Sequence, residues 1–151
     1  DHWHLAFAQH AGVHRLPLRR VDEHDAPYRL AARLAEAGVA YSIGRAGGSF
    51  AAANERNLPY EAGTAVAHGL PRDEALKAIT LYPAQILGVA DRLGSLAPGR
   101  LASFIVTDGD PLQIETQVLR VFIQGREVGI GNRQTRLADK YRQKYEQLKA
   151  R

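Results

Sequence analysis

The sequence contains no cysteine. This absence excludes a disulfide framework, a thiolate metal site and a cysteine nucleophile, and it leaves the redox compartment undecided. No apolar run approaches the roughly 20 residues that a membrane-spanning helix needs, and no signal-peptide pattern is found. A cytoplasmic and a periplasmic location are both compatible with these absences, so the sequence leaves the localisation open.

The chain has enough apolar residues to form a packed core. Hydrophobic residues make up 45% of its 151 residues, which is too many for a disordered chain. This length corresponds to one domain or to a piece of a larger one.

The positive charge is concentrated at the C-terminal end. Residues 132–151 carry seven Lys or Arg and two acidic residues, a net of +5, so the other residues sum to −1 within the total of +4. A basic tail can bind nucleic acid or another anionic surface, but no aromatic or glycine-rich RNA-binding pattern accompanies it. We therefore interpret the tail as a solvated helix face and expect neither a nucleic-acid nor a membrane partner.

Periodicity and turn residues predict helices in the first two thirds of the chain and strands after Asp91. The expected helices cover 1–10, about 26–37, 59–69, a stretch from Pro71 that Pro83 interrupts, and a tail from Asn132. The expected strands cover 39–43, 93–96, 101–107, 118–123 and 127–128, the last two forming a hairpin.

Two groups of segments resemble the amidohydrolase superfamily. Residues 57–62 (NLPYEA) and 75–88 (ALKAITLYPAQILG) are similar to the helical pair after the last barrel strand, in particular of imidazolonepropionase-like and dipeptidase-like members. Residues 93–111 and 121–126 (VFIQGR) are similar to the strands that return to the small β-sandwich of the family. The order, spacing and turn residues agree over about residues 38–128.

The resemblance implies an α/β fold: a C-terminal fragment of a (β/α)₈ metallohydrolase barrel, then strands of a small β-sandwich and a C-terminal helix. A whole barrel needs about 250 residues, more than this chain has. We expect the last barrel strands and helices in 1–90, sandwich strands in 91–130 and a basic amphipathic helix in 131–151.

The resemblance also implies hydrolytic chemistry at the C-terminal mouth of the barrel. In the family, one or two divalent metals such as zinc activate a water for attack on a C–N bond. The ligands are a His-x-His pair on the first strand, a bridging Lys or Glu, two further His, and an Asp at the end of the last strand. We expect no metal site in this chain.

The segment 39–43 matches the last barrel strand, but the expected Asp is missing. The sequence has Arg45 there and no carboxylate between Gly44 and Gly47. A guanidinium stays protonated and offers a metal no lone pair. One alternative is an anion pocket for substrate made by Arg45, Gly47, Gly48 and Ser49, because such loops direct N–H groups at a ligand. The other is a glycine-rich connection whose Arg faces water.

His14 is a further candidate substrate-binding residue, because the resemblance places it where the seventh strand emerges at the mouth. His2 and His4 have the His-x-His spacing, but we interpret them as surface residues of a short helix. Asp108 and Asp110 are paired carboxylates within a Gly-Pro turn, for which turn chemistry is the better explanation.

The sequence therefore indicates an amidohydrolase-like segment whose parent activity is metal-dependent hydrolysis of a peptide or non-peptide C–N bond. The chain alone is expected to be inactive, and whether it is an enzyme stays open. The alternative is a non-catalytic remnant or interaction module that pairs with another chain. A small-molecule substrate is expected only in a complete parent protein, and unpaired strand edges lead us to expect self-association.

Overall fold

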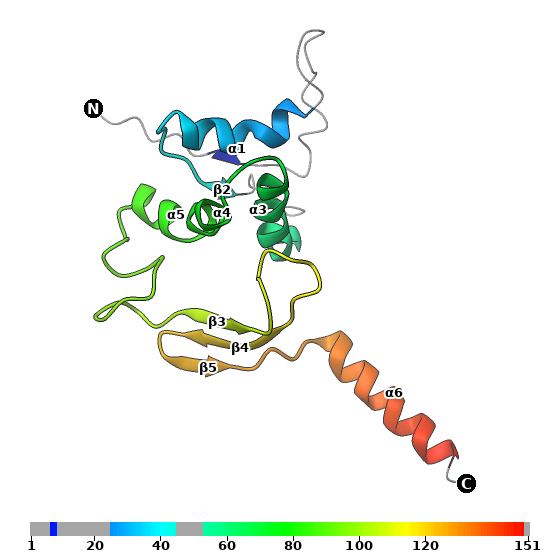
Figure 1. The fold of residues 1–151 in the computed structure, drawn as a ribbon. Helices are drawn as coiled ribbons and strands as arrows, with labels where there is room; N and C mark the ends of the chain where they lie inside the picture. Colours follow the sequence, from blue (N-terminus) through cyan, green and yellow to red (C-terminus); the bar gives the residue numbers. More distant parts are fainter. Residues whose placement is uncertain (1–6, 9–24, 45–52, 150–151) are drawn as a thin grey trace.

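The computed structural model describes residues 7–8, 25–44 and 53–149 (Figure 1). Its strands and helices are β1 (Phe7–Ala8), α1 (Ala26–Glu36), β2 (Ile43–Gly44), the 3₁₀ helix η2 (Glu55–Asn57), α3 (Leu58–Ala67), α4 (Arg72–Ile79), α5 (Leu81–Ile86), β3 (Phe104–Thr107), β4 (Val118–Ile123), β5 (Arg126–Val128) and α6 (Arg133–Lys149). It is a mixed fold of helices and two small sheets. None of the helices in the described ranges is long and apolar enough to cross a membrane.

A β–α–β unit opens the described part of the chain. β1 and β2 pair in parallel, Phe7 with Ile43 and Ala8 with Gly44, and α1 lies between them in the chain. The predicted helix over 1–10 is therefore wrong at Phe7–Ala8, where pairing with a distant strand overrides the local spacing of apolar residues. The predicted strand at 39–43 exists but is confined to its last residue and Gly44.

The predicted helix from about 26 to 37 is confirmed as α1. Pro27 lies in its first turn, where a missing N–H costs no hydrogen bond. Gly38 follows the helix with a φ of +66°, the left-handed conformation that ends helices. Asp25 stands at the N-cap without a side-chain capping bond and forms an ion pair with Arg29 at 3.1 Å instead.

Helices α3, α4 and α5 confirm the helical middle of the chain, with one correction. Pro83 was expected to interrupt the helix, but the break is at Thr80, and Pro83 is the third residue of α5. A proline in the first turn of a helix removes no intrahelical hydrogen bond, so α5 begins before it.

Small side chains let these helices pack closely around β2. The buried apolar cluster contains six alanines, two each from α1, α3 and α4, together with Tyr41, Ile43, Leu70 and Leu112. Alanine methyl groups allow close approach between helix backbones, and the larger side chains fill the remaining space. Leu112 is the one member from beyond residue 100, so it ties the later part of the chain to the helical body.

The second sheet has the antiparallel order β3-β4-β5. The predicted hairpin is confirmed: Gln124 and Gly125 link β4 to β5 with φ of 51° and 78°, as a two-residue hairpin turn requires. The predicted strand at 93–96 is wrong, because Gly94 has a φ of +87° and its segment turns instead of extending.

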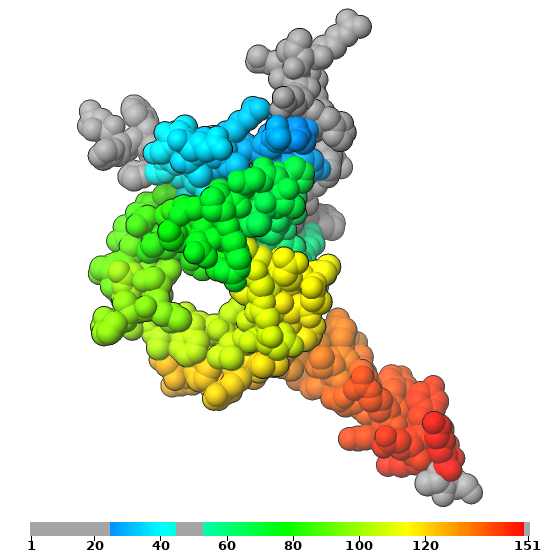
Figure 2. Space-filling view, in the orientation of Figure 1, coloured from blue at the N-terminus to red at the C-terminus, as the bar shows by residue number. Residues whose placement is uncertain are grey.

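Two features of this part of the molecule are visible at its surface. α6 extends away from the sheet and is exposed along its whole length (Figure 1). Figure 2 shows an opening between the helical body and the three-stranded sheet. The described residues therefore pack into a helical body and a sheet that meet only in part.

Candidate functional site

The parallel pair β1 and β2 indicates where a barrel-type site would lie. Both strands run in the same direction, so their carboxyl ends meet at one edge, the edge that bears active sites in (β/α)₈ enzymes. Arg45 is the next residue after β2. The predicted site residues Arg45, Gly47, Gly48, Ser49 and His14 all lie outside the described residues, so the anion pocket stays a prediction.

His2 and His4 also lie outside the described residues, whereas His68 lies within them. The His68 ring stacks on Tyr28 with centroids 4.9 Å apart, and its Nδ1 lies 2.9 Å from the carbonyl oxygen of Thr64. Both contacts are those of a packed side chain at the end of α3. Across the part of the chain that the structure describes, no three His, Cys, Asp or Glu side chains come together as a metal ion would need.

A hydrogen-bonded polar cluster joins α4 to α5. Glu74 accepts hydrogen bonds from Lys77 Nζ, at 2.8 Å, and from the Tyr82 hydroxyl. The hydrogen bonds from Lys77 and Tyr82 hold the pKa of Glu74 below its usual range. Burial, with the hydrogen bond to Glu74, raises the pKa of Tyr82 to about 12. The carboxylate is thus ionised with both oxygens engaged and the phenol is protonated at neutral pH, which suits neither for proton transfer.

A cavity of about 270 Å³ lies beside this cluster. Residues 38–41, just before β2, line one side, and Glu74, Tyr82 and Gln85 line another. The Tyr41 side chain is buried, its hydroxyl has no hydrogen-bond partner among the described residues, and burial raises its pKa to about 12. The cavity lies at the amino end of β2, opposite the edge that would carry barrel-type chemistry.

The cluster of Glu74, Lys77 and Tyr82 was missed by sequence reasoning. The three-residue spacing of Glu74 and Lys77 within a helix indicates one of its contacts. The other contact spans the break between α4 and α5, and no local pattern indicates that the Tyr82 hydroxyl returns to Glu74.

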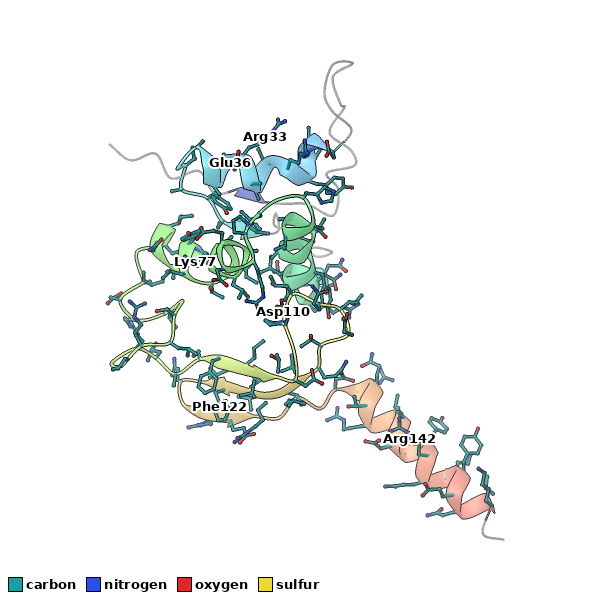
Figure 3. The ribbon with its side chains drawn as sticks, viewed as in Figure 1. Arg33, Glu36, Lys77, Asp110, Phe122 and Arg142 are labelled. Atoms are coloured by element: carbon teal, nitrogen blue, oxygen red, sulfur yellow. The ribbon has the colours of Figure 1, made fainter. Side chains whose placement is uncertain are left out.

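The turn after β3 holds the sheet against the helices. Asp110 accepts a hydrogen bond from Arg72 Nε at 2.6 Å and one from the Leu112 N–H at 3.0 Å. The Arg72 guanidinium is the main reason that the pKa of Asp110 lies below its usual range. Figure 3 shows Asp110 between the helical body and the sheet.

Asp108 has a similar structural role, because it accepts a hydrogen bond from the N–H of Gln117 at 2.7 Å. Both carboxylates of the pair are therefore occupied within the turn. The prediction that Asp108 and Asp110 serve turn geometry is confirmed.

Comparison with known proteins decides the family. The model of the amidohydrolase family matches residues 38–128, which is more than half of the chain. The chain belongs to the amidohydrolase family. The match includes β2, the helices α3 to α5 and the sheet β3-β4-β5.

Two curated relatives are similar over parts of this chain. An amidohydrolase, tasK, of Hapsidospora irregularis is 36% identical over 72 residues, which are 48% of this chain and 7% of that protein. An adenine deaminase of Methanoculleus marisnigri is 50% identical over 64 residues, which are 42% of this chain and 12% of that protein. The chain thus spans a small part of each relative.

Solved structures of amidohydrolases share the fold of a large part of this chain. One from Thermotoga maritima superposes with a TM-score of 0.62 at 32% identity and covers 68% of this chain and 26% of its own. A second amidohydrolase structure gives a TM-score of 0.56 at 27% identity and covers 72% of this chain and 27% of its own. The chain therefore corresponds to about a quarter of these proteins.

Proposed function

We propose that this chain is a segment of a metal-dependent amidohydrolase that hydrolyses a C–N bond. The observation that carries the proposal is the family match over residues 38–128. The names of its relatives, an amidohydrolase and an adenine deaminase, support a reaction at a C–N bond. The complete protein determines which substrate is hydrolysed and whether the C–N bond is a peptide or a non-peptide bond.

We further propose that the segment supplies the end of a (β/α)₈ barrel and one side of its β-sandwich. The parallel β1–α1–β2 unit supports the barrel assignment, because alternation of strand and helix with parallel pairing builds such barrels. The antiparallel sheet from β3 to β5 supports the sandwich assignment. The predicted division at residues 90 and 130 remains part of this proposal.

The divalent metal of the family does not fit the described residues. Glu74 and Asp110 are already hydrogen-bonded to basic partners, and His68 packs against Tyr28. A catalytic metal needs about three protein ligands and an open position. The role proposed for this chain is therefore to support the mouth, with Arg45 and the glycine-rich loop after β2 contacting an anionic group of the substrate.

Metal content and hydrolysis test this assignment together. We expect the purified chain to hold no stoichiometric zinc and to show no metal-dependent hydrolysis of dipeptides, N-acyl amino acids or adenine. Arg45→Asp restores one carboxylate of about three required ligands, so this variant should stay inactive too. One tightly bound zinc per chain, lost in a variant without His2 and His4, would contradict the proposal.

An interaction module is the second candidate, and the exposed face of the sheet favours it. Ile105, Val121 and Val128 lie opposite one another on β3, β4 and β5, and Ile123 follows on the same face. Ile105, Ile123 and Val128 are 47%, 54% and 40% exposed. Apolar faces of this kind are covered by other chains in many proteins, so this candidate predicts a stable complex in place of catalysis.

A further inference from the structure

Apolar and charged side chains lie on different faces of α6. Its apolar residues recur three or four positions apart and form one stripe: Leu137, Tyr141, Tyr145 and Leu148. Spacings of three, four and seven residues place side chains on the same face of a helix. The stripe is 39% to 61% exposed, and α6 points away from the body of the protein (Figure 1).

Basic residues flank the stripe on both sides, and the acidic residues lie on the opposite face. One flank contains Arg133, Lys140 and Lys144, and the other contains Arg142 and Lys149, whereas Arg136 lies farther from the stripe, toward the acidic face. The two acidic residues, Asp139 and Glu146, are seven positions apart and share the face opposite the stripe. The charges are therefore sorted by face.

The cations of the first flank are available to an external partner. Neither these three cations nor Arg136 form an ion pair within the described ranges, whereas Arg142 pairs with Asp139 at 2.9 Å across two exposed side chains. Exposed ion pairs of that kind contribute little. The helix thus presents an apolar strip between two cationic edges.

The N-terminal cap of α6 is formed by residues at the start of the helix itself. Asn132 Oδ1 accepts a hydrogen bond from the Thr135 N–H at 3.0 Å, and Thr135 Oγ1 accepts one from the Asn132 N–H at 3.0 Å. This reciprocal pair caps the first turn. With 17 residues, α6 is only slightly longer than the roughly 12–15 residues below which an isolated helix is marginal in water, so a surface that covers the stripe would stabilise it.

We propose that α6 binds an anionic lipid surface, lying flat with its stripe toward the acyl chains. Tyrosines suit the boundary between headgroups and acyl chains, and cations on both edges of the stripe can reach headgroups on either side. The acidic face then points to water. This proposal departs from the expectation from sequence alone that no membrane is involved, because the described residues leave the stripe uncovered.

The charge sorting favours this occupant over a second copy of the chain. Residues 132–151 carry a net charge of +5, so pairing two α6 stripes would bring their cationic edges together. A planar anionic surface attracts both edges at once. Each Lys or Arg near such a surface strengthens binding about fivefold.

Co-sedimentation of the full chain with vesicles tests the proposal. We expect binding to phosphatidylcholine vesicles that contain phosphatidylglycerol, little binding to phosphatidylcholine alone, and loss of binding at about 1 M salt. Far-ultraviolet circular dichroism should show a gain of helix with the anionic vesicles only. Equal binding to both vesicle types, or no binding to either, would overturn the proposal.

Charge variants locate the binding face. Reversing Lys140 and Lys144 to Glu should weaken binding by about 25-fold or more, from two contributions of about fivefold each. Reversing Arg92 and Arg126, exposed residues of the body, changes the net charge equally and should have little effect. Equal losses in both variants would mean that net charge alone drives binding, and α6 would not be the site.

Stripe variants separate lipid from protein occupants. Replacing Tyr141 and Tyr145 with Ala should weaken vesicle binding without lowering intrinsic helix propensity, whereas Gln143→Ala, on another face, should not. If the tyrosine variant instead converts a dimer to a monomer and leaves vesicle binding unchanged, a second copy covers the stripe and the lipid proposal is wrong.

Discussion

Gly63 allows the helical body and the turn after β3 to approach each other. It lies within α3, and a Cβ built on it would be 2.6 Å from the carbonyl oxygen of Leu112. Carbon–oxygen contacts in proteins are seldom closer than about 3.3 Å. The Leu112 backbone would therefore have to retreat by about 0.7 Å to admit an alanine, and its side chain, 5% exposed, would leave its place in the core.

Two opposing effects determine the result of Gly63→Ala. Alanine gains about 1 kcal/mol over glycine in a helix interior. Overpacking costs about 1–3 kcal/mol, and partial exposure of Leu112 adds a share of the roughly 1.5–3 kcal/mol that burial of a leucine provides. We expect a net loss of about 1–3 kcal/mol in the free energy of unfolding.

Urea denaturation followed by circular dichroism measures this loss. With a slope of about 2 kcal/mol/M, the midpoint should fall by about 0.5–1.5 M. Gly129→Ala is the matched control, because a Cβ there meets nothing within 4 Å, and its midpoint should stay close to that of the wild type. A urea midpoint of Gly63→Ala above that of the wild type would mean that helix propensity dominates and that the Leu112 backbone shifts at little cost in free energy.

Three further predictions concern other contacts. Tyr41→Phe removes a buried hydroxyl that has no partner within the described part of the chain, so urea denaturation should show unchanged stability or a gain of up to about 1 kcal/mol; a clear loss would reveal a partner for the hydroxyl. Asp110→Asn should destabilise the protein at neutral pH, because the pKa of Asp110 is lowered in the folded state. The stability that the wild type gains from this carboxylate is fully present above the unfolded pKa of about 3.9 and is lost as pH falls through the folded pKa. If urea titrations show a difference in stability that does not change with pH, the mechanism is contradicted. The wild-type chain should self-associate in light scattering over a concentration series, and Ile123→Lys should reduce this association by placing a charge on the exposed sheet face; a wild-type monomer at all concentrations would refute it.

The elements that the sequence predicted best are those with local signals. Pro27 and Gly38 mark the two ends of α1, and Gln124 and Gly125 mark the turn of the hairpin between β4 and β5. Each acts through its own backbone preference or that of its neighbours. No distant contact is needed to interpret them.

The errors arose where distant contacts decide the structure. Phe7 belongs to a strand because Ile43 pairs with it across 35 intervening residues. The segment at 93–96 turns because Gly94 approaches α5: a Cβ on it would be 2.7 Å from the Ala84 Cβ and 2.8 Å from the Thr80 carbonyl oxygen. Neither partner can be identified from the local sequence. The candidate substrate pocket at Arg45 could be named from the resemblance, but its geometry depends on residues outside the described ranges.

The polar contacts among the described residues hold structural elements together and do not form a reactive site. Arg72 and Asp110 join α4 to the turn after β3, Glu74 and Tyr82 join α4 to α5, and Arg120 bonds Glu127 across the hairpin at 2.7 Å. Each of these carboxylates is bound to a partner on another element or strand, and within the described ranges none belongs to a group of three His, Cys, Asp or Glu side chains that could hold a metal. A hydrolytic reaction at a barrel mouth would need metal-binding groups from outside the described residues. Substitutions at Arg45 should therefore change the binding of an anionic substrate in a complete protein, because the proposed role of this residue is to contact the anionic group of that substrate.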